Sequence, residues 1–223
     1  MSRSTPRREG SQSHRSLSTF IERTHQALGE LMVRRLDDIR LAVLMLDGIE
    51  LKGRTCVVAL GITSQGVKIP LGLWEGSTEN STVATALLSD LIERGLDTTQ
   101  GVLCVIDGSK ALRKAIRDVL GEHAPVQRCI RHKERNVLGH LPQRDRALVR
   151  RRLRAAWAAW ADTDYDRALG RLEQLAAELA HTHPGAASSL CEEMAETLTL
   201  SRLRITGSLT RTLASTNPIE SMT

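Results

Sequence analysis

Two short runs of apolar residues, LAVLML at 41–46 and VLCVI at 102–106, are each followed directly by Asp-Gly. A run of this length without polar residues predicts a strand buried at the centre of a sheet. The chain has 223 residues, of which 41% are apolar, so it is long enough to bury such a sheet in one substantial domain. These two runs therefore indicate a folded, layered protein.

The spacing of apolar residues changes along the chain. Residues 67–74 alternate between apolar and other side chains, and they follow 55–63 across a Gly-containing turn, which predicts a hairpin. We expect an α/β fold with one mixed sheet, in which an antiparallel meander is continued by βαβ units. The expected strands are 41–46, 55–63, 67–74, 102–106 and 125–129; helices are expected over 18–36, 83–92 and 109–121, and then near 130–140, 143–161, 164–181, 186–199 and 201–213.

The first candidate site is the pair Asp47 and Asp107, one at the end of each apolar run. If the two strands are neighbours, the carboxylates lie close together and repel unless a cation sits between them. Oxygen ligands of this kind suit Mg²⁺ or Mn²⁺, which can assist phosphoryl transfer. The alternative is that Asp-Gly is only a turn pair.

A third carboxylate, Glu220, follows Asn217-Pro218 near the end of the chain. Asn217 can cap a helix and Pro218 suits its first position, so the pattern alone favours a capping role for Glu220.

Cys129 and His132 form a Cys-x-x-His pair. The other candidate ligands lack paired spacing, so a structural zinc site is not favoured. If a helix begins at 129, the two side chains face the same side; a buried thiol beside a hydrogen-bonded histidine fits the pattern equally well.

Positive charge is concentrated in residues 110–154, which hold 14 basic and 4 acidic residues, a net charge of +10. Such a segment suits a polyanion, although it can also be a solvated helix face. Aromatic residues make up only 2% of the chain, which argues against single-strand binding by stacking. The candidate DNA ligands are Lys110, Arg113, Lys114, Arg131, Lys133 and Arg135.

The sequence gives no support for a membrane protein, a secreted protein, a nucleotide-binding protein or a serine hydrolase. There is no apolar run long enough to span a membrane and no secretory signal, and the four cysteines are widely spaced, which suits a reducing cytoplasm. A P-loop, a GxGxxG motif and a Ser-His-Asp arrangement are also absent.

Five sequence blocks together resemble one family. They are MLDGIELKGR, ALGITSQGVKIPLGLWEGSTEN, VIDGSKALRKAIR, QRCIRHKERNVL and STNPIESM. In this order they are similar to the Mutator-type transposases of bacterial insertion sequences, over roughly residues 25 to 223. The resemblance implies a ribonuclease-H-like fold with an Asp-Asp-Glu triad at Asp47, Asp107 and Glu220. It also implies that Cys129 and His132 are the family's Cys-x-x-His signature.

The resemblance further implies a metal-dependent reaction, with Mg²⁺ or Mn²⁺ as two ions held by the triad. The enzyme would cut double-stranded DNA at the element's ends and join the freed 3′-OH to target DNA, in the cytoplasm. A homo-oligomer is compatible with this chemistry, and no membrane partner is expected. The implied organisation is a disordered basic tail at 1–17, a lead-in helix at 18–36, the catalytic core at 37–129, an all-helical insertion at 130–213 and the start of the Glu-bearing helix at 214–223.

Because only 46 residues precede Asp47 and three follow Glu220, we expect a truncated copy with little or no cleavage activity. Two alternatives remain open at this point. One is a catalytically dead DNA-binding fragment that uses 110–154, and the other is a metal-dependent nuclease without strand transfer.

Overall fold

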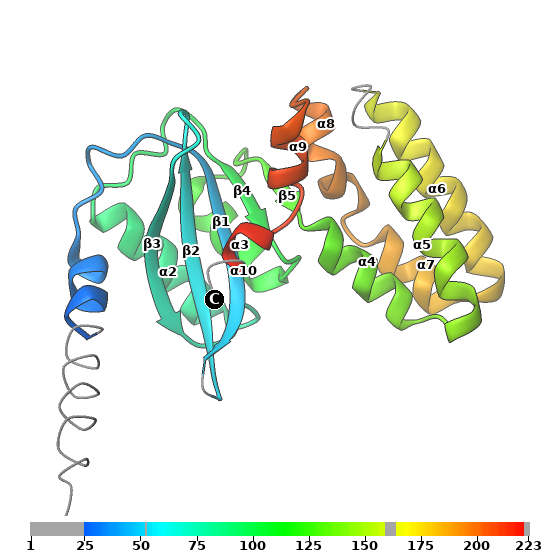
Figure 1. The fold of residues 1–223 in the computed structure, drawn as a ribbon, viewed down its shortest axis with the longest axis horizontal. Helices are drawn as coiled ribbons and strands as arrows, with labels where there is room; N and C mark the ends of the chain where they lie inside the picture. The colour runs from blue at the N-terminus through cyan, green and yellow to red at the C-terminus, as the bar shows by residue number, and fades with distance from the viewer. Residues whose placement is uncertain (1–24, 52, 159–163, 221–223) are drawn as a thin grey trace, which may run out of the picture.

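The computed structural model describes residues 25–51, 53–158 and 164–220, with the side chain of Glu220 excepted (Figure 1). The tail expected at 1–17 lies outside the described residues, and so does the first part of the helix expected at 18–36. Residues 25–33 of that helix are helical. Within the described ranges, no helix is long and apolar enough to cross a membrane.

A mixed sheet of five strands, in the order β3-β2-β1-β4-β5, forms the centre of the fold. β1 pairs antiparallel with β2, and β2 pairs antiparallel with β3. β4 runs parallel to β1 and to β5. The α/β class and the mixed sheet are therefore confirmed. The strands are β1 (Leu41–Leu51), β2 (Arg54–Thr63), β3 (Lys68–Glu75), β4 (Leu103–Ile106) and β5 (Val126–Arg128).

The end of β1 differs from the prediction. The strand does not stop at Asp47 but continues to Leu51, and Asp47 lies opposite Val58 of β2. The hairpin turns only after Leu51 pairs with Arg54. Asp-Gly is thus not a turn here, because pairing with β2 continues past it. β4, by contrast, does end at Ile106, directly before Asp107.

Helices α2 (Ser81–Glu93) and α3 (Lys110–Leu120) cover one face of the sheet. Asn80 caps α2 with its side chain, and Ser109 caps α3 in the same way, as their positions before the apolar helical runs predict. Because side chains alternate along a strand, neighbouring residues of β1 pack into the hydrophobic cores on opposite faces of the sheet. Leu44 and Leu46 pack with α2 and α3, whereas Val43 and Met45 pack with the helices that follow β5.

Among the described residues after β5 there are helices and no strands, and most of these helices stack beside the sheet (Figure 1). The helices expected at 186–199 and 201–213 are each broken. Glu193 and Arg204 have φ angles of 44° and 56°, a left-handed conformation that a continuing helix excludes. The elements are α4 (Ile130–Gly139), α5 (Gln143–Ala158), α6 (Tyr165–Thr182), α7 (Pro184–Cys191), a 3₁₀ helix (Met194–Leu198), α8 (Thr199–Arg202), α9 (Ser208–Leu213) and α10 (Asn217–Glu220).

The last element brings the end of the chain back to the sheet. α10 contacts β1, and its residue Ile219 is fully buried in the core shared by the sheet and the helices after β5. Residues far apart in the sequence therefore meet beside Asp47.

Candidate active site

Asp47 lies in β1, and Asp107 directly follows the neighbouring parallel strand β4 at the same level. Leu46 of β1 pairs with Ile106 of β4, so the next residues, Asp47 and Asp107, lie opposite each other in the same register. Asp47 is only 3% exposed, and Asp107 is half-buried at the point where the chain leaves the sheet. The arrangement brings two carboxylates together from residues that are 60 positions apart in the sequence.

Both oxygens of the Asp107 carboxylate accept a hydrogen bond. The Ser109 amide donates to Oδ1 at 2.8 Å, and the Thr78 hydroxyl donates to Oδ2 at 2.8 Å. Ser109 in turn donates its hydroxyl to the Thr78 carbonyl at 2.5 Å, which ties the loop before α2 to the start of α3. The orientation of Asp107 is thereby fixed from two sides.

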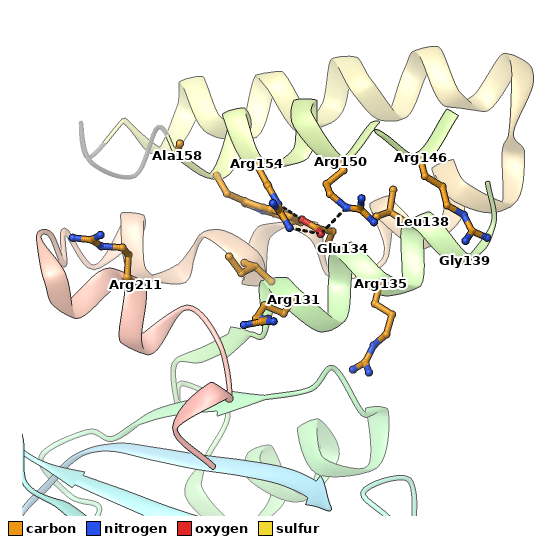
Figure 2. Close-up of a pocket in the computed structure, with 12 residues that line it drawn as sticks. Arg131, Glu134, Arg135, Leu138, Gly139, Arg146, Arg150, Arg154, Ala158 and Arg211 are labelled. Carbon is orange, nitrogen blue, oxygen red and sulfur yellow. Dashed lines mark hydrogen bonds and ion pairs between the residues drawn. The ribbon is translucent and has the colours of Figure 1, made fainter. Parts of the chain in front are cut away.

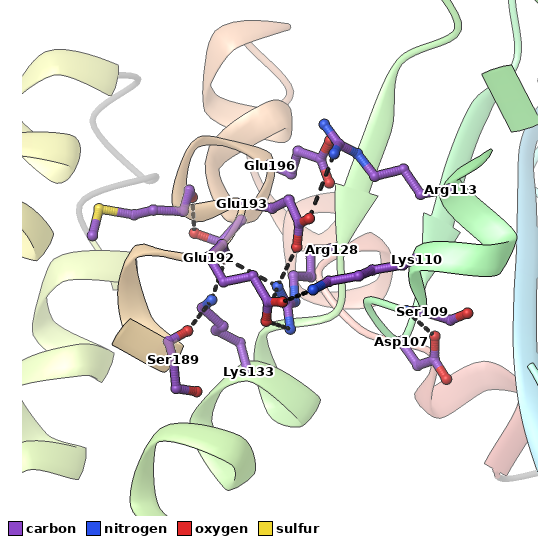
Figure 3. A network of polar contacts seen from close by, with 12 residues as sticks. Asp107, Ser109, Lys110, Arg113, Arg128, Lys133, Ser189, Glu192, Glu193 and Glu196 are labelled. Carbon is purple, nitrogen blue, oxygen red and sulfur yellow. Dashed lines mark hydrogen bonds and ion pairs between the residues drawn. The ribbon is translucent and has the colours of Figure 1, made fainter. Parts of the chain in front are cut away.

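Gly108 allows Arg128 to pack against the same turn. Its φ of +105° is unfavourable for other residues, and a Cβ there would overlap the Arg128 guanidinium. Arg128 is 2% exposed and donates to the Glu193 carboxylate at 2.7 Å and to the Glu192 carbonyl at 3.0 Å. The turn that carries Asp107 is thus anchored to the helical region (Figure 3).

The Asp47 carboxylate is in a less polar place. Burial raises its pKa, and the negative charge of Asp107 adds to this, while the Thr216 hydroxyl and the charge of His132 act in the opposite direction. Gly48 donates its amide to Oδ1 at 3.0 Å. A buried carboxylate with a raised pKa beside a second carboxylate is a place that a cation stabilises.

Cys129 and His132 stand next to Asp47. Cys129 precedes α4 and is 1% exposed, its amide donates to the Ile106 carbonyl at 2.7 Å, and its Sγ accepts from the Thr216 hydroxyl at 3.6 Å. Burial alone would raise the pKa of the Cys129 thiol, but the hydrogen bond and charge of His132 outweigh it and lower the pKa. Burial would likewise lower the pKa of His132, yet Cys129 and Asp47 raise it. The two residues therefore stabilise each other's charged form.

Glu220 is the last residue of α10, and its side chain lies outside the described residues. The segment before it is well anchored, since Thr216 is fully buried between Cys129 and Asp47. Among the described side chains, no three from His, Cys, Asp and Glu form a metal-binding group. The two aspartates alone supply hard oxygen donors, which fit Mg²⁺ or Mn²⁺.

The expected DNA ligands on α3 are engaged with acidic side chains (Figure 3). Lys110 pairs with Glu192 at 3.1 Å, and Arg113 pairs with Glu196 at 2.6 Å. Lys114 pairs with Asp118. All three side chains remain exposed to solvent: 76% of Lys110, 48% of Arg113 and 62% of Lys114. They can still reach a phosphate, but in competition with these carboxylates.

Lys133 requires a correction. It was expected on the cationic surface, but it is fully buried and donates to the carbonyls of Ser189 and Glu192. Burial, with the charge of Arg128, lowers its pKa to about 8. Arg131 and Arg135, on the same helix, are exposed as expected.

The sequence did not single out Thr78 and Thr216 as supports of the two aspartates. Each makes contacts with residues 29 or 87 positions away, which no local pattern encodes. The available signal is that each lies just before a helix that adjoins the site.

Comparison with known proteins finds transposases, both by family and by individual relatives. The model of the family described as "Transposase, Mutator family" matches residues 8–223. A probable transposase for an insertion sequence element of Corynebacterium diphtheriae is 30% identical over 171 residues, which are 72% of this chain and 48% of that protein. The transposase for the element IS6120 of Mycolicibacterium smegmatis is 29% identical over 184 residues, covering 80% of this chain and 54% of the relative.

A similar match is found to the transposase for IS905 of Lactococcus lactis, at 29% identity over 73% of this chain and 42% of the relative. The chain therefore spans about half the length of the curated relatives it matches.

Proposed function

The chain belongs to the Mutator family of transposases, and from this premise we propose that it is the catalytic core of an insertion-sequence transposase. Its reaction is metal-dependent cleavage of phosphodiester bonds at the ends of an element, followed by transfer of the freed 3′-OH to target DNA. Its substrate is double-stranded DNA. The core is ribonuclease-H-like, a proposal supported by the mixed sheet, in which Asp47 of β1 lies beside Asp107 at the end of β4.

One observation carries the proposal. Asp47 and Asp107 continue the register of two paired parallel strands, and the buried carboxylate of Asp47 lies close enough to sense the charge of Asp107. Two carboxylates so placed are costly for folding unless they serve a bound cation.

Asp47, Asp107 and Glu220 are the residues that would hold Mg²⁺ or Mn²⁺. The metal would activate the attacking oxygen and stabilise the leaving oxygen in phosphoryl transfer. Around it, Thr78 and Ser109 hold the Asp107 carboxylate by hydrogen bonds to its two oxygens. Thr216 and His132 moderate the pKa of Asp47 and so favour its ionised, ligating form.

Cys129 and His132 act as positioning residues in this proposal. Cys129 joins the end of β4 to the start of α4 through the Ile106 carbonyl, and it contacts Thr216 ahead of α10. The pair thereby connects the strand that carries Asp107 with the segment that carries Glu220.

A strand-transfer assay tests the proposed function. The chain is incubated with Mn²⁺, a duplex that carries a free 3′-OH and a plasmid target, and joined product is measured on a gel. This proposal predicts joining, although the sequence alone led us to expect little or no cleavage. The joining should be lost in Asp107→Asn and kept in Asp118→Asn, an exposed aspartate of α3 paired with Lys114.

The same assay separates the alternatives. Nicking without joining would instead indicate a metal-dependent nuclease. Binding of duplex DNA with neither nicking nor joining, in Mn²⁺, would contradict the catalytic proposal and indicate a DNA-binding fragment.

A further inference from the structure

The helices after β5 enclose a cavity of about 1020 Å³ between α4, α5 and α9, which we call the arginine groove (Figure 2). Its floor is apolar, formed by side chains such as Leu138 and the buried Trp157. Of the residues that the structure describes, six arginines and one acidic residue, Glu134, line it. The arginines are Arg131, Arg135, Arg146, Arg150, Arg154 and Arg211.

Three of these arginines are held in place by the protein. Glu134 accepts from Arg150 at 3.2 Å and from Arg154 at 2.8 Å, so one carboxylate is shared by two guanidinium groups. Arg146 donates to the Leu141 carbonyl at 2.9 Å, a neutral partner that leaves its charge uncompensated. Guanidinium groups fixed in this way are prepared to bind an anion at low entropic cost.

The other three have no ion-pair partner among the residues that the structure describes. Arg131 and Arg135 extend from α4, and Arg211 extends from α9 (Figure 2). All three are exposed. With six arginines and one glutamate, the lining carries an excess of five positive charges.

The spacing of the arginines suits a chain of phosphates rather than a single anion. Arg146, Arg150 and Arg154 recur every fourth residue of α5, which places them about 6 Å apart in one row. Arg131 and Arg135 form a shorter row with the same spacing on α4. Arginines from two helices that border one groove can contact successive phosphates of a nucleic-acid backbone.

The described lining of the groove offers no exposed aromatic ring on which a base could stack. Trp157 is 3% exposed and donates its indole N–H to the Thr197 hydroxyl at 3.2 Å. A single strand bound through its bases needs exposed aromatic rings, so the backbone of a duplex is the better occupant.

The groove begins beside the paired aspartates. α4 starts at Ile130, whose amide donates to the Ala214 carbonyl at 3.0 Å, two residues before Thr216. The first turn of this helix also carries His132, whose pKa responds to Asp47, and Arg131, which lines the groove. One short helix thus links the two places.

We propose that the arginine groove binds the sugar–phosphate backbone of duplex DNA on one side of the bond that is cut. This inference rests on the proposed function, because it assumes that DNA lies across Asp47 and Asp107. It adds Arg146, Arg150, Arg154 and Arg211 to the DNA surface and gives the helical region a defined task.

The test compares three sets of variants by fluorescence anisotropy with a labelled duplex over a range of salt concentrations. The groove set is Arg131→Gln, Arg135→Gln and Arg211→Gln together. The control set removes equal charge from exposed arginines outside the groove lining, with Arg151→Gln, Arg202→Gln and Arg204→Gln. The third set replaces the three groove arginines by lysine, which keeps the charge.

The groove set should bind the duplex at least about tenfold more weakly than the parent. The slope of log affinity against log salt concentration should become less steep by about 3, one unit for each lost phosphate contact. The control set and the lysine set should keep a slope within about one unit of the parent. Equal loss in the groove and control sets would show that only net charge matters, and it would overturn the proposal. So would a groove set that binds like the parent while its thermal unfolding is unchanged.

All binding is measured with Asp107→Asn present, which removes cleavage from the readout. If the parent chain joins DNA and the groove set keeps full affinity for the duplex, the proposal for the arginine groove is wrong and the catalytic proposal stands. A groove set that loses affinity while the parent never cuts DNA contradicts the catalytic proposal and leaves the groove supported.

Discussion

Thr216 Oγ1 lies 3.6 Å from Sγ of Cys129, across 87 residues of sequence. The same hydroxyl interacts with the Asp47 carboxylate and lowers its pKa. Thr216 is fully buried and lies four residues before Glu220. The segment that leads to the third expected acidic residue is therefore attached both to the first aspartate and to the start of α4.

This contact predicts a specific role for the Thr216 hydroxyl. Thr216→Val keeps the volume and removes the hydroxyl, so we expect Mn²⁺-dependent cleavage to fall by about 10- to 100-fold through misplacement of Asp47 and α10. Thr216→Ser keeps the hydroxyl and should stay within a few-fold of the parent. Single-turnover cleavage rates measure both. A valine variant as active as the parent, with the same melting temperature, would show that the hydroxyl has no positioning role.

Lys133 gives a prediction on pH. Its pKa in the folded protein is lowered to about 8 from the ordinary 10.5, because the side chain is buried near Arg128. Between these values the folded protein binds fewer protons than the unfolded chain, so the free energy of unfolding rises with pH over this window. Lys133→Met has no titratable group, and it removes the lysine's hydrogen bonds to the Ser189 and Glu192 carbonyls, of which the second keeps its bond from Arg128. It should destabilise the fold by about 1–3 kcal/mol at pH 7, and by more at about pH 10.

Urea unfolding of the parent and the variant at the two pH values measures this difference. Lys114→Met serves as the control, because Lys114 is exposed and paired with Asp118. A stability difference for Lys133→Met that shrinks as the pH rises would contradict the burial of a lysine with a lowered pKa.

Gly108 should be needed for two separate reasons, its backbone conformation and the space for Arg128. Gly108→Ala strains a residue with φ +105° and also displaces the Arg128 guanidinium. Gly101→Ala is the matched control, since Gly101 has φ +80° and nothing lies within 4 Å of the added Cβ. We expect Gly101→Ala to cost about 1 kcal/mol and Gly108→Ala to cost at least 1–2 kcal/mol more, measured by thermal or urea unfolding. Equal costs would mean that Arg128 moves aside freely.

The centre of the fold was predictable because it depends on local patterns. The apolar runs before Asp47 and Asp107 identified the two central strands, and the helix expected over 109–121 corresponds to α3. The end of β1 was not predictable in this way. Asp47-Gly48 resembles a turn locally, and only the continued pairing with β2 extends the strand.

The features that the sequence predicted wrongly, the helix through Glu193 and the exposure of Lys133, depend on contacts between distant residues. Glu193 adopts a left-handed conformation beside Arg128, which breaks a segment with good helical composition. Lys133 was expected outside because of its charge, yet it shares a helix face with Val137, four residues on, and both are buried. That spacing was a usable signal. The carbonyls that satisfy its ammonium group come from Ser189 and Glu192, which the sequence around 133 does not indicate.

Binding of Mn²⁺ is the most direct measurement of the central claim, that Asp47 and Asp107 form a metal site for phosphoryl transfer. Free Mn²⁺ is followed by electron paramagnetic resonance while the chain is titrated, with Asp47→Asn, Asp107→Asn and the control Asp118→Asn alongside. The account predicts that the parent and Asp118→Asn bind Mn²⁺, and that each of the other two substitutions weakens binding by about tenfold or more while the chain stays folded. Mn²⁺ binding that is equal in all four proteins would contradict it.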